Sequence, residues 1–290
     1  MAVVTSALLF GTLAIYGTYA QSEHLTIVTL LSLRFLIAAI TLWAMVVVRR
    51  QLYWPGAHRA AQLGVLGLLF VGQSACYFLS LRSVPAAVTA ILLYIYPVVV
   101  TVLGWLLFRE RLSLRSAVAL VIAACGVVLV IGVTPSGHLD ISGVAWGIGA
   151  GLLYAVYIVV GKRVLDDVTP LLSMAVVSST AAVTFLVYGA ITGSVRSFDG
   201  AGWLTVFGAA LLPTVLGATL FLFGLARIGP TRASILSTLE PVATGVLASV
   251  LLAQRLSVTR ALGGAAVLVA AALVATGTKA RRDAPVRVAH

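Results

Sequence analysis

The sequence predicts an all-α polytopic membrane protein of ten transmembrane helices, arranged as two inverted five-helix repeats. Three observations lead to this fold class: the composition, a series of long apolar segments, and a similarity between the two halves of the chain. Of the 290 residues, 61% are hydrophobic and 9% are charged, and the mean hydropathy is +1.12. Such a composition is typical of a chain whose solvent is the lipid bilayer.

Ten segments are long and apolar enough to cross the hydrocarbon layer, which takes about 20 helical residues for roughly 30 Å. In chain order they are 3–20, 27–48, 61–81, 86–108, 114–133, 141–161, 170–192, 203–226, 231–253 and 258–278. Helices are expected because backbone groups inside lipid must be satisfied within the protein. The segments also lack the alternating pattern of membrane barrel strands.

The second half of the chain repeats the first. Residues 77–130 align without gaps on residues 221–274, a shift of 144 residues, and fourteen of the 54 aligned positions are identical. Pro97 falls on Pro241 in this alignment. Duplicated hydrophobic chains are typical of transporters, whose halves move against each other around a site between them. The expected domains are a first repeat at 1–133, a second repeat at 141–278 and a basic tail at 279–290.

The distribution of basic residues predicts the topology. Counted over alternate connections, fourteen Lys and Arg lie on one side and only four lie on the other, namely Arg82, Arg196, Arg255 and Arg260. By the positive-inside rule both termini are cytoplasmic, and five spans per repeat then make the repeats inverted. The net charge of +11 therefore indicates topology and not a nucleic-acid partner. A multi-pass plasma-membrane protein is expected, in a bacterial inner membrane because Arg, Ala and Gly suit a GC-rich coding sequence.

No catalytic constellation is visible, so an enzyme is not expected, and neither a metal nor a cofactor is predicted. The four histidines lie in connections or in the tail, namely His24, His58, His138 and His290. The partners expected are a small-molecule substrate and the bilayer, with protons a candidate for coupling. The glycines at 143, 147 and 151 are interpreted as a packing stripe within the chain, so a monomer is favoured over a dimer.

Two charged residues lie well inside the spans. A charge at that depth costs several kcal/mol and normally faces protein or a wet cavity, so Arg34 and Glu240 are candidate substrate-binding residues. At 1.5 Å per residue they lie roughly 6 Å apart along the membrane normal. Glu240 suits an ammonium group or a proton, and Arg34 suits a carboxylate. The alternatives are a structural Arg34–Glu240 ion pair and an Arg34 that snorkels to the interface.

Pro97 and Pro241 are candidate kink and gating residues. Each lies in the middle of a span and deprives a carbonyl four residues earlier of its helical partner, at Leu93 and Ser237. Freed carbonyls at this depth are tolerated where they line a cavity or are covered by neighbouring helices. A simple packing kink is the alternative.

Tyrosines at a similar depth complete the candidate substrate site, because a buried phenol needs a hydrogen-bond partner. Tyr96 is the repeat counterpart of Glu240, and Tyr77 and Tyr154 are the further candidates for the cavity wall. Tyr94 and Tyr157 lie at a similar depth and suit the same wall. Ordinary helix packing is the alternative for each.

These motifs resemble the EamA-type, ten-helix branch of the drug/metabolite transporter superfamily. The resemblance rests on PVVVTVLGWLLFRERL at 97–112, PVATGVLASVLLAQRL at 241–256, SALLFGTLAIYGTYA at 6–20, the Arg34-Phe35 pair and the Leu-Glu-Pro-Val of 239–242. One departure is Gln254, which stands where the family usually has the glutamate that Glu110 matches. The resemblance implies export of small metabolites, and the last motif is similar to that of amino-acid exporters.

The function predicted is therefore export of small metabolites, amino acids or related compounds, by alternating access around a midplane cavity. The cavity is expected mainly between the third, fourth, eighth and ninth spans, with Glu240 facing Tyr96 across the pseudo-two-fold axis. Multidrug efflux of apolar cations, with Glu240 as the cation site, is the alternative within the same class. A lipid scramblase or a non-transporting membrane scaffold is the alternative of a different class.

Overall fold

The computed structural model describes residues 1–108, 114–132, 140–164, 168–198, 200–221, 223, 237, 239–254 and 257–277. Within these ranges the chain is helical and contains no strand. The first repeat supplies α1 (Ala2–Gly11), α2 (Leu13–Ser22), α3 (Ile27–Val48), α4 (Ala57–Ser80), α5 (Ala86–Leu93), α6 (Tyr96–Phe108) and α7 (Leu114–Gly132). The second supplies α8 (Ile141–Val164), α9 (Pro170–Thr192), α10 (Gly200–Ala209), the π-helix η2 (Ala210–Gly217), α12 (Leu239–Leu251) and α13 (Val258–Gly277).

The described helices confirm the predicted fold class. Six are long and apolar enough to cross a membrane and four are shorter apolar helices, so together they account for the ten expected spans. Several spans differ from the prediction. The first is interrupted at Thr12, whose side chain donates to the carbonyl of Leu9 (2.6 Å), and the fourth is interrupted between Leu93 and Tyr96. The third begins at Ala57 instead of residue 61, and the eighth at Gly200 instead of residue 203. Residues 133, 222, 224–236, 238 and 278–290 lie outside the described residues, and with them parts of the eighth and ninth predicted spans, the last residue of the fifth and of the tenth, and the basic tail.

Several helix ends follow directly from the sequence. Thr26 caps α3 by accepting a hydrogen bond from the Thr29 N–H (3.0 Å), as an N-terminal threonine does. Helix α9 begins with Pro170, whose missing N–H needs no partner in the first turn. It ends at Gly193, where φ is 62°, a left-handed conformation that favours glycine.

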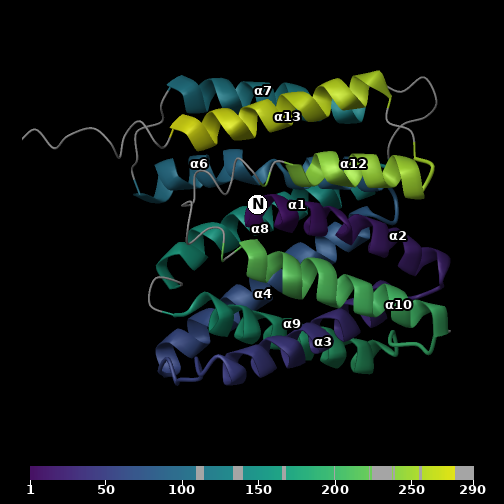
Figure 1. Cartoon of the computed structure of the whole chain (residues 1–290). Coiled ribbons are helices and arrows are strands. Elements are labelled where there is room, and N and C mark those ends of the chain that lie inside the picture. The colour runs from purple at the N-terminus through teal and green to yellow at the C-terminus, as the bar shows by residue number, and fades with distance from the viewer. Residues whose placement is uncertain are drawn as a thin grey trace, which may run out of the picture.

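Helices that are equivalent in the two repeats pack against each other. Figure 1 shows α7 beside α13 at one edge of the bundle, with α6 and α12 next to them, and α3 with α9 toward the opposite edge. Between these pairs the repeats interleave, because α4 packs on α8 and α1 packs on α12. A frame of this kind places the fourth and ninth spans, which carry Pro97 and Pro241, near the junction of the repeats.

The glycine stripe of α8 packs inside the molecule, as the sequence predicted. A Cβ atom on Gly147 would lie 2.7 Å from Leu92 Cδ1, and one on Gly151 would lie 3.0 Å from the carbonyl oxygen of Leu93. Gly143 approaches Ser83 and Val84 equally closely. The fourth span is therefore held directly against α8, and only glycine allows this approach.

Connections that should share one membrane side do lie together. Gln21 donates a hydrogen bond to the Leu81 carbonyl (3.0 Å), and Thr26 donates to the Ser194 carbonyl (2.7 Å). At the other end the Thr169 N–H donates to the Tyr53 hydroxyl (3.0 Å). These contacts agree with spans that alternate in direction.

Candidate functional site

The fourth span is broken where the sequence predicted a proline kink. Helix α5 ends at Leu93 and α6 begins at Tyr96. Because Pro97 has no N–H, it cannot donate a hydrogen bond to the Leu93 carbonyl. The two residues after Leu93 instead donate to carbonyls three positions earlier, which makes a tighter turn than that of an α-helix. The N–H of Tyr94 bonds the Ile91 carbonyl (3.0 Å) and that of Ile95 bonds the Leu92 carbonyl (3.3 Å).

Tyr94, which lies in the break, connects the fourth span to the ninth. Pro241 likewise removes the donor that the Ser237 carbonyl would have in a regular helix. The Tyr94 hydroxyl donates a hydrogen bond to that carbonyl. The same hydroxyl lies 3.0 Å from Glu240 Oε2. The first repeat therefore satisfies the carbonyl that the proline of the second repeat releases, and this contact also positions the Glu240 carboxyl.

A continuous path of aromatic rings starts at this acid. Tyr94 contacts Tyr96 with centroids 5.5 Å apart, and Tyr96 contacts Tyr154 edge-on at 4.8 Å. Tyr154 then stacks on Tyr157 at 6.0 Å. The path continues through Phe70 to Phe35, at 5.5 Å and 5.7 Å. Two of the predicted tyrosines, Tyr96 and Tyr154, thus lie together beside Glu240.

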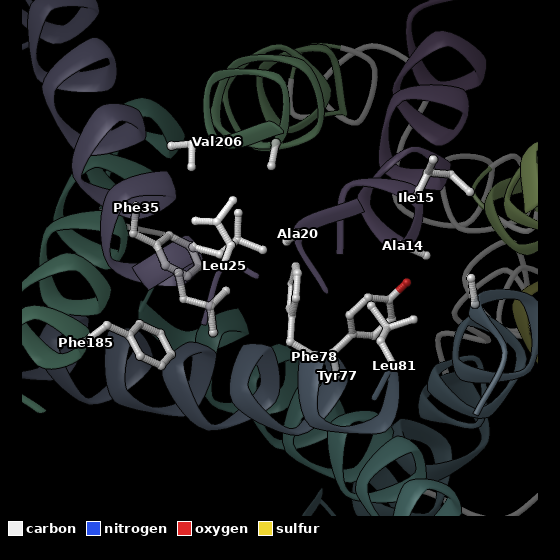
Figure 2. Close-up of a cluster of buried hydrophobic side chains, with 14 of the residues drawn as sticks. Ala14, Ile15, Ala20, Leu25, Phe35, Tyr77, Phe78, Leu81, Phe185 and Val206 are labelled. Carbon is white, nitrogen blue, oxygen red and sulfur yellow. The ribbon is translucent and has the colours of Figure 1, made fainter. Parts of the chain in front are cut away.

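Arg34 lies at the other end of this path. Its guanidinium carbon is 4.6 Å from the ring centroid of Phe35 and 5.6 Å from that of Phe78. The residue is only 3% exposed, so it does not snorkel to the interface. Figure 2 shows the neighbouring cluster, in which Phe35 of α3 faces Phe185 of α9 and α4 contributes Tyr77 and Phe78.

The polar contact of Arg34 comes from a π-helical turn. Pro213 cannot give the Ala209 carbonyl an α-helical donor, the helix widens to a π-helix, and the Thr214 hydroxyl donates to that carbonyl (2.9 Å). This bond orients the Thr214 oxygen to accept a hydrogen bond from Arg34 Nε (2.8 Å). The Nη1 atom of Arg34 is buried and has no hydrogen-bond partner among the residues that the structure describes.

Arg34 and Glu240 are not joined by an ion pair in the described part of the chain, because one bonds Thr214 and the other bonds Tyr94. A buried guanidinium with an unpartnered donor is costly unless an anion completes it. Tyr77 contacts the ring of its neighbour Phe78 at 5.7 Å and does not join the tyrosine path. The central cavity expected around Glu240 stays a prediction.

Tyr94 was predicted only as one of several tyrosines at the depth of the cavity, without its hydrogen bonds, and Thr214 was not predicted at all. The signal for Tyr94 was its position three residues before a proline, in the broken turn. The signal for Thr214 was Pro213 in the eighth span, since a hydroxyl next to a mid-span proline is a natural donor for the freed carbonyl. Neither signal, however, identifies the partner across the bundle.

Comparison with known proteins agrees with this architecture. The model of the EamA-like transporter family matches residues 1–132 and again residues 141–276. An uncharacterized transporter of Archaeoglobus fulgidus is 29% identical over 271 residues, which is 92% of each chain. The threonine/homoserine exporter RhtA of Escherichia coli K12 is 29% identical over 224 residues, 74% of this chain and 73% of its own. One solved crystal structure has a TM-score of 0.70 at 21% identity, covers 95% of this chain and 96% of its own, and shows the fold alone.

Proposed function

Because the chain belongs to the EamA-like transporter family, we propose that this membrane transporter exports small zwitterionic metabolites, amino acids or related compounds, by alternating access. The family and the relatives are transporters, so the chain is a transporter and not an enzyme. Export and the substrate class are the proposed part. RhtA, a relative of this chain, is a threonine/homoserine exporter, which agrees with the substrate class.

The observation that carries the proposal is a cation and an acid that do not neutralise each other. Arg34 is buried and its Nη1 donor has no partner among the described residues, while Glu240 accepts a hydrogen bond from Tyr94. An amino acid carries a carboxylate and an ammonium group. The carboxylate would take the free donor of Arg34 in a charge-assisted hydrogen bond, and the ammonium group would take Glu240 and the tyrosine rings beside it.

The hydrogen bonds of Tyr94 support a role for protons. A phenol has one proton, and Tyr94 lies within bonding distance of two acceptors, the Ser237 carbonyl and Glu240. If Glu240 is protonated, it donates to the Tyr94 oxygen, and Tyr94 donates to the carbonyl. If Glu240 is ionised, the two acceptors compete for one proton. Proton binding and substrate binding at Glu240 would thereby be coupled.

Alternating access is proposed to use the breaks at Pro97 and Pro241, where spans of different repeats meet. The predicted topology remains part of the proposal: both termini cytoplasmic, a bacterial inner membrane and a monomer. It can be tested by labelling single cysteines in intact cells, placed at Arg82 and at Arg115. Reagents that do not cross the membrane should reach position 82 and leave position 115 unlabelled.

The test of function is transport by purified protein in liposomes. Vesicles loaded with pooled radiolabelled amino acids, with and without a pH gradient, should release threonine or a similar solute when the wild-type protein is present. Arg34→Met and Glu240→Gln should each lower this rate at least about tenfold, since each removes a charged partner worth a few kcal/mol. Arg115→Gln, a change at an exposed arginine, is the control and should transport normally.

The double variant Arg34→Met, Glu240→Gln distinguishes a site from a structural pair. Recovery of both stability and transport in the double variant would contradict the proposed site. Release of no soluble solute by the wild type, together with lipid exchange between leaflets, would favour a scramblase instead.

One observation favours a second candidate, efflux of apolar cations. The rings of Tyr94, Tyr96 and Tyr154, in the path that starts at Glu240, would suit a lipophilic cation as well as an ammonium group. In that case Arg34→Met should leave cation efflux intact while Glu240→Gln abolishes it.

A further inference from the structure

A groove at one end of the bundle has no part in the proposed transport site. It has a volume of about 530 Å³ and lies among the ends of α3, α4 and α9. Its far ends carry Arg82, which follows α4, and Arg196, which follows α9. Both arginines are exposed, and in the described part of the chain neither guanidinium has a carboxylate or another side chain as partner.

The two arginines are unusual for their side of the molecule. The connections on that side carry only four basic residues, and two of these four line this one groove. The positive-inside rule selects against arginine there. Two exposed guanidinium groups that line one groove make it positively charged, which suits an anion.

One wall of the groove is apolar. Val71, Ala75 and Leu79 lie four residues apart on one face of α4 and so form a wall roughly 12 Å long. Phe185 of α9 lines the groove as well. Hydroxyl groups line the groove too, among them Thr26, which is fixed by its bond to the Ser194 carbonyl (2.7 Å).

We propose that this groove binds an anionic phospholipid, with its phosphate between Arg82 and Arg196 and an acyl chain along Val71, Ala75 and Leu79. The lining combines the kinds of group that a phospholipid needs: two guanidinium groups, several hydroxyl groups and an apolar wall. Guanidinium groups bind phosphate in a bidentate manner, which lets two of them enclose one headgroup. The bound lipid would bridge α4 and α9, which belong to different repeats.

The experiment is native mass spectrometry of the purified full chain, titrated in detergent with phosphatidylglycerol or with phosphatidylcholine of the same acyl chains. The wild type should retain one phosphatidylglycerol at least about tenfold more tightly than phosphatidylcholine. Equal retention of the two lipids by the wild type would overturn the proposal without any variant.

Variants then locate the lipid. Arg82→Gln with Arg196→Gln should remove the preference, whereas Arg115→Gln, at an exposed arginine of α7, should keep it. Ala75→Phe fills the apolar wall and should weaken phosphatidylglycerol binding with both arginines present. If Arg115→Gln weakens binding as much as the double variant, the lipid is held by general charge and the assignment is wrong.

A soluble headgroup without acyl chains tests whether the ligand of the groove is a lipid. Glycerol 3-phosphate should displace phosphatidylglycerol only at concentrations at least about a hundredfold higher, because it lacks the buried hydrocarbon. Equal competition, combined with no effect of Ala75→Phe, would make the groove a site for small soluble anions and overturn the proposal.

Discussion

The two repeats carry their buried charges at different positions. The shift of 144 residues that aligns the repeats places Tyr96 opposite Glu240. Extended to α3 and α9, whose limits it matches within one residue, the same shift places Ser178 opposite Arg34. Each repeat thus supplies one charged residue where the other has a neutral one. Duplication explains the symmetric arrangement of the helices. The differences between the repeats place a cation, Arg34, in one repeat and an acid, Glu240, in the other, which suits a substrate that carries both charges.

The two prolines show the same division of roles. In the first repeat the carbonyls released near Pro97 lie against Gly151, a residue of the second repeat. In the second repeat the carbonyl released by Pro241 accepts a hydrogen bond from Tyr94, a residue of the first. Each break is therefore covered by the opposite repeat, one by close packing and one by a hydroxyl group. The hydroxyl group that covers the second break, that of Tyr94, also bonds the charged residue Glu240 (3.0 Å).

The comparison of Glu240 with Tyr96 predicts the largest effect. Glu240→Gln should lower transport on the order of a hundredfold with normal folding, since a charge partner of the substrate is lost. Tyr96→Phe keeps the ring contact of 4.8 Å with Tyr154 and removes only a hydroxyl, so transport should fall by less than about fivefold. Initial rates in liposomes measure both. Equal losses would mean that the site is more symmetric than the sequence difference suggests.

A change at Gly151 should have the next largest effect, on stability. A new Cβ there would lie 2.6 Å from Ile95 Cγ2 and 3.0 Å from the Leu93 carbonyl oxygen. Gly151→Ala should therefore lower the melting temperature of the detergent-solubilised protein by several degrees, a loss of about 1–3 kcal/mol. Gly149→Ala is the matched control, because its Cβ would meet only Cys76 Sγ at 3.6 Å. Alanine usually stabilises a helix relative to glycine, so an increase for both variants would refute the close approach.

The hydrogen bond between Tyr94 and Ser237 predicts a coupling with Pro241. Pro241→Ala restores the N–H that the Ser237 carbonyl lacks, and we expect transport to slow a few-fold as the ninth span straightens. Tyr94→Phe should cost about 1 kcal/mol of stability in the Pro241 protein and less in the Pro241→Ala protein. A double-mutant cycle on thermal unfolding measures the difference. Additive effects would show that the two changes do not share the carbonyl.

The sequence predicted the helical spans well and the contacts between them poorly. The spans follow from local rules about the length and composition of apolar segments, and the structure confirms the all-helical fold class among the described residues. Arg34 and Glu240 were placed at similar depths by helical rise, yet depth alone leaves open which way each side chain points around its helix. The ion pair was for this reason a reasonable alternative that the structure does not contain among the described residues.

The partner of Arg34 could not have been predicted by the same rules. A π-helical turn inserts a residue and rotates everything after it, so the face on which Thr214 lies is not given by a period of 3.6 residues. Likewise the role of Tyr94 depends on a proline 147 residues later in the chain. Contacts between repeats become visible only when both helices are placed.

The smallest effect is expected at Gln254, where this chain departs from the family pattern. Its Oε1 atom accepts a hydrogen bond from the Ala86 N–H (3.1 Å), which is the first N–H of α5. Gln254→Ala should lose a helix cap worth about 1 kcal/mol and lower the melting temperature by a few degrees, while transport changes less than about twofold.

Gln254→Glu restores the usual family residue and adds a negative charge at a helix N-terminus, which is favourable by about 0.3–1 kcal/mol. That variant should match or exceed the wild type in melting temperature, and its advantage should shrink in high salt. The shift of 144 residues places Pro230 opposite Ala86, and a proline has no N–H to offer the equivalent glutamate, Glu110. A Gln254→Glu protein that unfolds more readily than the wild type would show that the second repeat needs a neutral residue here, and the family glutamate would then serve a different purpose in each repeat.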